Sequence, residues 1–351
     1  MVKVISMFNN KGGVSKTTTT FNLGWAMASK GKKVLLIDAD PQSNLTSLAL
    51  SIPDEDAFEA LYNRKDSNDI KAVADNLDSP GGMTIERSQS VSNIVPTIKE
   101  NLFVLPGHIE IEQTSAEITT ALQVGGVRIF KRMKTIPVYL NIAFRRIAEI
   151  HSLDYILIDM APSLSGLNQV LLMGSDYFIT PCAPDFFSKI ALQNIAKVIP
   201  EWHSIASAYD SDYPLPCNPK FLGVIEQNYR PRRSKDGDDK NTPAKEFSRW
   251  MDEIRYVTNN ILVPELKKKN LVIDEQKFLS VVKEYKPYDL AFISDFNSLI
   301  AFSQKHNMPV FELTEKEIKR SGAVLDGMLE NVEKFKKTFE RLAEVVIALT
   351  E

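Results

Sequence analysis

The first forty residues constrain the fold more than any other part of the chain. A short apolar run, residues 2–8, leads into the segment NNKGGVSKTT at residues 9–18. An apolar helical stretch with a natural stop at Gly31 follows, and a second apolar run then ends in Asp38 and Asp40. Near-continuous apolarity is typical of strands buried on both faces of a parallel sheet. The order strand, loop, helix, strand therefore predicts an α/β fold, a mostly parallel twisted sheet with helices on both faces.

The segment between the first strand and the first helix has the chemistry of a phosphate-binding loop. Backbone N–H groups of residues 12–17 can wrap a phosphate at the helix N-terminus. Lys16 is expected to reach the β- and γ-phosphates, and Thr17 to place its hydroxyl on Mg²⁺. Thr18 can contact the α-phosphate through its N–H or its hydroxyl. The alternative is a glycine turn without a ligand, which the flanking strand and helix disfavour.

The loop departs from the general formula G-x-x-x-x-G-K-[ST], because Asn10 and Ser15 stand where the outer glycines belong. KGGVSKTT instead resembles the deviant Walker A pattern K-G-G-x-x-K-[ST] of the ParA/MinD ATPases, in the SIMIBI class of P-loop proteins. Relatives often carry glycine at the position of Ser15, so that residue is a mild departure. The resemblance implies ATP and Mg²⁺ as cofactors. The loop residues it implies for the nucleotide are Lys11, Gly12, Gly13, Val14, Ser15, Lys16, Thr17 and Thr18.

The second lysine of the loop, Lys11, is also explained by this resemblance. In the family the equivalent lysine crosses an ATP-dependent sandwich homodimer and touches the phosphates of the partner chain. A cation supplied in trans neutralises charge on the transferring phosphoryl group, as an arginine finger does. The resemblance thus implies that Lys11 and Lys16 are both catalytic, and that dimerisation depends on ATP.

Aspartates at strand ends are expected to complete the site. Asp38 and Asp40 alternate on a strand and therefore share a face. By resemblance, Asp40 orients or activates the attacking water, and Asp38 lies near the Mg²⁺ shell. The segment LDYILIDMAPSLSG, residues 153–166, resembles the Walker B element, so Asp159 is expected to hold Mg²⁺ through water. The family more usually has D-x-P-P here, and Ala161 in place of the first proline is expected to loosen that loop.

Two later stretches resemble the strands that flank the adenine base in the family. In FLGVIEQNYRPR, residues 221–232, Gln227 occupies a position where relatives often carry a base-contacting Asn or Thr. Residues 290–313 resemble the last strand and the helix after it, which predicts Asp295 beside the base. Residues 184–186, Pro-Asp-Phe, resemble a family stretch near the dimer face.

The spacing of these motifs predicts one ParA-like domain over residues 1–351. The long interval before Asp159 predicts a family-variable insertion within about 52–150, with a loop or hairpin at 75–98 and an amphipathic helix at 137–151. Residues 229–243 are predicted to form a flexible charged loop. Cys182 and Cys217 fit no metal or redox spacing and are expected to be unpaired thiols.

Three functions are compatible with such an ATPase. The first is a ParA-type partition ATPase, which binds DNA without sequence preference and is stimulated by a ParB-like activator. Its DNA contacts would come from three basic clusters, at residues 128–134, 230–235 and 267–269. The family's DNA-contacting arginine after the last strand is absent, because Asp295 stands in its place. A protein of this kind is expected in the cytoplasm, where it can associate with the nucleoid.

The second function is a MinD-like positioning ATPase that acts on a membrane or a protein partner without DNA. It would need a membrane-binding C-terminal helix, but the apolar positions at residues 332–349 favour a helix packed in the core. No apolar run is long enough for a membrane span, and no membrane binding is expected. The third function, a cluster-carrying reductase, is excluded because the two cysteines do not fit the ligand spacing.

Overall fold

The structure is a computed structural model of the chain. It describes residues 1–50, 52, 56, 60, 69–77, 94–123, 136–209, 215–231 and 243–351. Residues 78–93 of the predicted loop or hairpin at 75–98, much of the predicted insertion and most of the predicted charged loop at 229–243 therefore lie outside the described residues. The described ends of the first segment are helical at 75–77 and form a short strand at Val95–Pro96.

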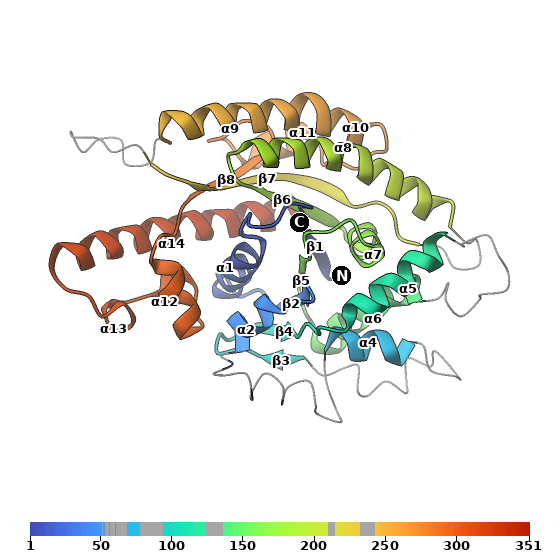
Figure 1. The fold of residues 1–351 in the computed structure, drawn as a ribbon, viewed down its shortest axis with the longest axis horizontal. Helices are drawn as coiled ribbons and strands as arrows, with labels where there is room; N and C mark the ends of the chain where they lie inside the picture. Colours follow the sequence, from blue (N-terminus) through green and yellow to red (C-terminus); the bar gives the residue numbers. More distant parts are fainter. Residues whose placement is uncertain are drawn as a thin grey trace.

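One sheet of eight strands organises the described chain, in the order β3-β4-β2-β5-β1-β6-β7-β8 (Figure 1). The strands are β1 (Lys3–Met7), β2 (Val34–Ala39), β3 (Val95–Pro96), β4 (Leu102–Leu105), β5 (Tyr155–Met160), β6 (Tyr177–Cys182), β7 (Lys220–Tyr229) and β8 (Asp289–Ser294). Neighbouring strands run parallel except for the short antiparallel pair β3 and β4. The predicted fold class is confirmed.

Helices cover both faces of this sheet (Figure 1). One face carries α1 (Lys16–Ser29), α2 (Asn44–Leu50), α12 (Leu299–His306), α13 (Glu315–Ile318) and α14 (Gly322–Thr350). The other carries α4 (Ile70–Leu77), α5 (Ile111–Gln123), α6 (Ile136–His151), α7 (Gly166–Gly174), α8 (Phe186–Ser207), α9 (Lys245–Val257) and α10 (Val263–Lys267). The short helix α11 (Glu275–Val281) contacts α14. The π-helical turn η4 (Thr258–Leu262) joins α9 to α10, and the 3₁₀ turn η5 (Val310–Glu312) follows α12. The predicted helix at 137–151 is α6.

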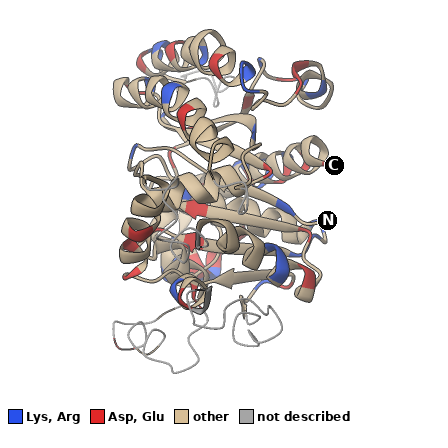
Figure 2. Cartoon of the chain, turned by 90° about the vertical axis from the view of Figure 1, so that its right-hand side faces the viewer, with Lys and Arg blue, Asp and Glu red and all other residues tan. Residues whose placement is uncertain are grey.

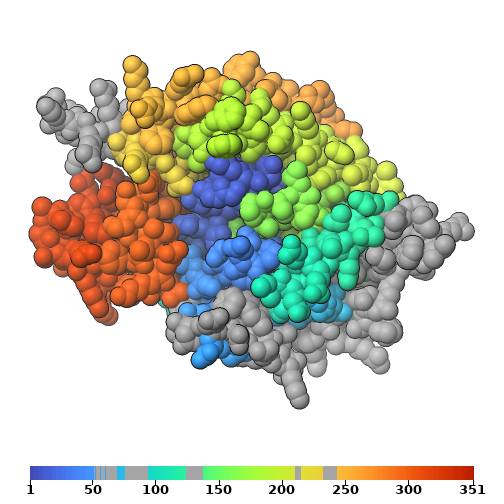
Figure 3. Space-filling model, viewed as in Figure 1, coloured from blue at the N-terminus to red at the C-terminus, as the bar shows by residue number. Residues whose placement is uncertain are grey.

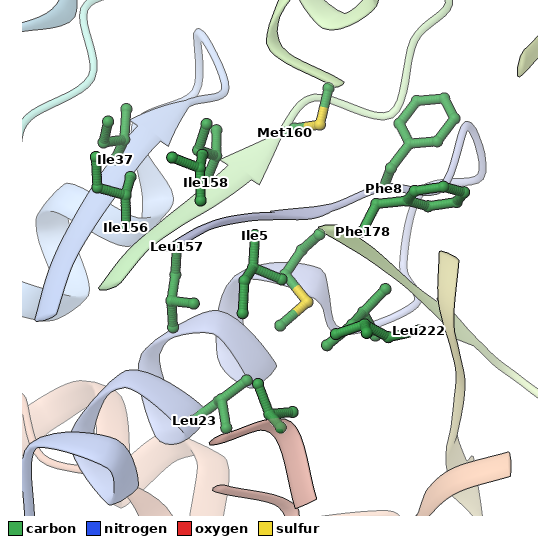
Figure 4. Packing of buried hydrophobic residues seen from close by; sticks show 14 of the residues in the cluster. Ile5, Phe8, Leu23, Ile37, Ile156, Leu157, Ile158, Met160, Phe178 and Leu222 are labelled. Carbon is green, nitrogen blue, oxygen red and sulfur yellow. The ribbon is translucent and has the colours of Figure 1, made fainter. Parts of the chain in front are cut away.

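The apolar strand residues form the core because both faces of the sheet are covered. Every residue of β2 and of β5 is buried. Figure 4 shows side chains of neighbouring strands, such as Ile5 and Leu157, packing towards Leu23 of α1. This packing fixes the carboxyl ends of the central strands, where the loops that follow them meet.

The C-terminal helix α14 packs on α1 and β8. Its predicted apolar positions are all buried: Val332, Phe335, Phe339, Leu342, Val346 and Leu349. The prediction of a core-packed helix is confirmed, so the apolar face that a membrane would need is already covered by protein. A search of the described helices finds none with the length and apolarity to cross a bilayer.

Candidate functional site

The segment after β1 forms a compact loop that ends at the start of α1. Gly13 and Ser15 both have left-handed backbone conformations, with φ of 72° and 54°. Glycine adopts this conformation freely, whereas serine does so at a cost. α1 begins at Lys16, so its first N–H groups have no partner within the helix and line a cleft. The loop therefore lies at a helix start and lines a cleft, as predicted, and its contacts with phosphate stay a prediction.

Lys16 is nearly buried, with 7% of its surface exposed. Its Nζ donates hydrogen bonds to the carbonyl oxygens of Asn9 at 3.1 Å and Lys11 at 3.2 Å. Burial lowers the pKa of Lys16, and the carboxylates of Asp159 and Asp40 oppose that shift. The lysine therefore rests on its own loop, beside two acids.

Lys11 does not line the cleft but lies at its rim, against the start of α8. Its Nζ forms an ion pair with Asp185 and donates a hydrogen bond to Ser188 Oγ at 3.2 Å. Asp185 also caps α8, because its Oδ1 accepts a hydrogen bond from Ser188 N at 2.8 Å. The ion pair holds the pKa of Asp185 below its usual value, although burial opposes this. The second lysine is thus held by an acid of its own chain.

Asp159 lies at the carboxyl end of β5, where it pairs in register with Asp38 of β2 and Met7 of β1. Both of its carboxylate oxygens are buried without a hydrogen-bond partner among the described residues. Burial, and secondarily the charge of Asp38, raises the pKa of Asp159 to about 8. A buried carboxylate without a donor is expensive unless a cation binds it. With the Thr17 hydroxyl nearby, this arrangement fits Mg²⁺, a cation that prefers oxygen ligands.

Asp38 is fully buried and accepts hydrogen bonds from the start of α2. Its Oδ2 accepts hydrogen bonds from Thr46 N at 2.8 Å and Thr46 Oγ1 at 2.7 Å. Its Oδ1 accepts one from Asp40 N at 3.3 Å. Burial raises the pKa of Asp38 to about 6, against the lowering effect of these bonds. Asp38 therefore lies beside Asp159 but away from the cleft, and its predicted place near Mg²⁺ stays a prediction.

Asp40 lines the cleft, as expected for a residue that positions water. Its Oδ1 accepts a hydrogen bond from Gln42 N at 3.0 Å, which makes the turn after β2. The turn leaves the carboxylate facing the loop rather than the core. Its catalytic role stays a prediction.

The cleft between the loop, α2 and α12 has a volume of about 1070 Å³. In Figure 3 the dark blue N-terminal residues are exposed at the centre of this view, between the lighter blue of α2 and the orange C-terminal segment. Seven of the eight predicted loop residues line it, all except Lys11: Gly12, Gly13, Val14, Ser15, Lys16, Thr17 and Thr18, together with Asp40 and Pro162. The cleft is large enough for a nucleotide.

The two predicted base contacts do not line this cleft. Gln227 is fully buried under the loop, where its amide bonds Val14 O and Thr19 Oγ1. Asp295 lies in the turn after β8, and its Oδ1 accepts a hydrogen bond from Asn297 N at 2.8 Å. Both residues stay predictions as adenine contacts, and Gln227 has a second role in the loop.

Several cleft residues were not singled out by the sequence. They come from the turn after β2, from α2 and from α12, and they are Gln42, Asn44, Ser47, Leu48, Ile300, Gln304, Lys305 and Asn307. Asn307 holds α12 against α2, because its Nδ2 donates to Ser47 O at 2.9 Å and Leu48 O at 3.0 Å. No local motif marks these residues, since the fold alone brings them to the loop.

The basic clusters are only partly within the described residues. Residues 128–134 lie outside them, and so does 232–235 in the second cluster. In the third cluster, Lys267 pairs with Glu275 at 3.1 Å and Lys268 with Glu265 at 2.6 Å. Figure 2 shows acidic and basic residues interspersed over the helices on that side. The described part of the third cluster is therefore largely neutralised by neighbouring acids.

The cysteines agree with their predicted state. Cys182 and Cys217 are both free thiols, and burial raises the pKa of Cys182. Among the described residues, no group of three His, Cys, Asp or Glu side chains is arranged to hold a metal ion. The cysteines supply no cluster site in the part of the chain that the structure covers.

The loop, the strand order and the acids at the strand ends define a P-loop nucleotide-binding protein. The sequence profile of the family described as AAA domain (AAA_31) matches residues 2–208. The chain belongs to this family, within the ParA/MinD group of P-loop ATPases.

Curated relatives agree with this assignment. The chain is 29% identical over 199 residues to the sporulation initiation inhibitor protein Soj of Bacillus subtilis, a match that covers 57% of this chain and 65% of Soj. It is 28% identical to the virulence plasmid ParA family protein pGP5-D of Chlamydia psittaci, over 56% of this chain and 62% of that protein. The matches thus span less than two thirds of these relatives' own length.

Solved structures share the fold over nearly the whole chain. The ATP complex of Cyanothece McdA aligns with a TM-score of 0.60 and 14% identity, covering 96% of this chain and 95% of that one. The pNOB8 ParA bound to nonspecific DNA aligns with a TM-score of 0.52 and 20% identity, covering 100% and 99%. At these identities the likeness establishes the fold.

Proposed function

We propose that the chain is a slow ATPase that works as an ATP-dependent dimerisation switch of the ParA type. The observation that supports this most is the state of its two loop lysines. Lys16 rests on loop carbonyls inside the cleft, whereas Lys11 is held at the rim by Asp185. A lysine at the rim cannot serve its own cleft while it is paired there, but it can serve a second chain placed against that rim.

Each residue of the site then has a defined task. Lys16 neutralises the β- and γ-phosphates in cis, and Lys11 does so in trans. Thr17 and Asp159 hold Mg²⁺, with Asp38 behind them, and Asp40 orients the attacking water through its half-buried carboxylate. When bound, Mg²⁺ supplies charge neutralisation on the transferring phosphoryl group.

The test is hydrolysis and self-association measured together. Purified chain with ATP and Mg²⁺ is expected to release phosphate slowly and to form dimers, while ADP gives monomers. The Lys16→Ala variant serves as the inactive control, because it removes the cis cation. A chain that binds no ATP, or that hydrolyses it as a monomer, would refute the proposed switch.

We infer that DNA is the first target to test, with plasmid or chromosome partition as the process and a ParB-like protein as the activator. Soj, pGP5-D and the DNA-bound pNOB8 ParA support this choice. DNA retention is measured with ATP, ADP or no nucleotide over a salt series. Retention that needs ATP, ignores sequence and falls steeply with salt would support nonspecific DNA binding on the nucleoid.

The second candidate is a positioning ATPase that acts on a protein partner without DNA. The acids that neutralise Lys267 and Lys268 favour it, since they weaken one of the three basic clusters. The buried apolar face of α14 gives a membrane partner no support. An ATP-dependent dimer that retains no DNA at low salt would favour this candidate over the first.

A further inference from the structure

The end of strand β7 is bonded directly to the phosphate loop. The Nδ2 of Asn228 donates hydrogen bonds to Ser15 Oγ at 3.0 Å and to Gly13 O at 3.5 Å. The Ser15 hydroxyl also lies 3.2 Å from Asn228 Oδ1, to which it can donate. These contacts join residues that are 213 to 215 positions apart in the chain. They place one amide side chain across the two left-handed residues of the loop.

Gln227, the residue before Asn228, holds the loop from below. Its Nε2 donates to Val14 O at 3.0 Å, and its Oε1 accepts from Thr19 Oγ1 at 2.8 Å. Gln227 and Thr19 are fully buried, so neither side chain has water as an alternative partner. Together, the two residues at the end of β7 contact the loop at Gly13, Val14 and Ser15.

The loop needs such support because its conformation is costly without a ligand. Ser15 has φ of 54°, a region that residues other than glycine, asparagine and aspartate seldom adopt. Asn228 has φ of 61°, which asparagine tolerates well.

We propose that Gln227 and Asn228 form a latch that holds the phosphate loop in its phosphate-receiving conformation before the nucleotide arrives. They are positioning residues, and this role rests on the proposed function. The latch acts on the phosphate end of the ligand. A residue that recognises adenine, which the sequence predicts for Gln227, acts on the other end. The two roles therefore differ in which part of the ligand they affect.

Inorganic tripolyphosphate separates these roles, because it has phosphates but no base. The test measures the Kd of ATP and of tripolyphosphate, each by competition with a fluorescent ATP analogue in the presence of Mg²⁺. Asn228→Gly keeps the positive φ and removes the amide. It is expected to raise both Kd values by about tenfold, the size of one lost hydrogen bond together with a looser loop. kcat at saturating ATP is expected to stay unchanged, because the loss affects ground state and transition state alike.

Three further variants control the experiment. Asn270→Gly changes a second asparagine with positive φ, which is exposed and lies beside Lys220 at the opposite end of β7, and it should leave both Kd values and the unfolding temperature unchanged. Ser15→Gly should weaken binding less than Asn228→Gly, because glycine relieves the strain at that position. The double variant of Ser15 and Asn228 should bind no worse than Asn228→Gly alone, since both changes remove the same bond.

Distinct results overturn the proposal. Unchanged Kd values in Asn228→Gly would refute the latch, and so would strictly additive effects in the double variant. A loss for ATP but not for tripolyphosphate would assign the end of β7 to the base instead. If the unaltered chain bound neither ligand, the proposed function would fail and the latch with it. If the unaltered chain bound both ligands and Asn228→Gly bound them equally well, only the latch would fail.

Discussion

The ion pair between Lys11 and Asp185 leads to a quantitative prediction. If Lys11 must leave Asp185 to reach the phosphates of a second chain, the ion pair opposes dimerisation. The Lys11 side chain is 20% exposed and that of Asp185 is 41% exposed, so water screens the pair. Ion pairs that are this exposed to solvent stabilise a structure by about 0.5–1 kcal/mol each. A symmetric dimer opens two of them, which costs about 1–2 kcal/mol in total, or roughly a five- to thirtyfold weaker dimer.

Asp185→Asn removes the charge and keeps the cap of α8, because asparagine caps a helix as well as aspartate does. This variant is therefore expected to dimerise roughly five- to thirtyfold more tightly in the presence of Mg²⁺ and a non-hydrolysable ATP analogue. Sedimentation velocity over a range of protein concentrations measures the change. Without nucleotide, the variant should stay a monomer, since the lysine then has no phosphate to bind.

The control is an ion pair of similar exposure that includes neither Lys11 nor Asp185. Lys189 and Glu253 pair at 2.8 Å between α8 and α9, with 28% and 37% of their side chains exposed. Glu253→Gln should leave dimerisation unchanged, and Asp185→Asn should have no effect in a Lys11→Ala background. Weaker or unchanged dimerisation of Asp185→Asn would show that Asp185 does not restrain Lys11, and the reasoning would be wrong.

Three other predictions test the site and the core. Lys11→Ala and Asp40→Ala are each expected to bind ATP but to hydrolyse very little of it; wild-type phosphate release from either would remove the assigned role. Burial and the nearby charge of Asp289 raise the pKa of Glu226 well above its usual value, so the folded chain holds that proton and loses stability as pH rises through and above the pKa of the unfolded carboxyl. In urea unfolding over a pH series, Glu226→Gln should gain most over the original chain at high pH, and an equal gain at every pH would contradict this cause. Phe339→Ala should cost about 3–5 kcal/mol of unfolding free energy, because the ring is fully buried; a loss below about 1 kcal/mol would mean that α14 does not complete the core.

The elements of the fold were predictable where a local pattern determines them. The apolar runs that became β1, β2 and β5 are buried on both faces, and burial of that kind leaves a continuous apolar sequence. The helix α6 follows from its apolar period alone. The order of the strands was not predictable in this way. β1 lies between β5 and β6, both of which come more than 140 residues later.

The candidate site was likewise predictable only where a local sequence motif determines it. The loop and the acids at the strand ends are local motifs, and the sheet brings them together. The partners of those motifs are not local. Asp185 contacts Lys11 across 174 positions, and Gln227 contacts Val14 across 213. A glutamine at the end of a strand can contact either a base or a loop. The local sequence around it does not distinguish these two contacts.

The two lysines of the loop differ in how easily a phosphate can replace their present hydrogen-bond partners. Lys16 donates to neutral carbonyls, and a charged phosphate oxygen is a stronger acceptor than these. A nucleotide entering the cleft can therefore recruit Lys16 at little cost. Lys11 already has a carboxylate, so one phosphate group offers it no clear gain until a second chain places a triphosphate at the rim. On the proposed function, this difference sets the order of events: the nucleotide binds one chain through Lys16 first, and Lys11 is released only by dimerisation.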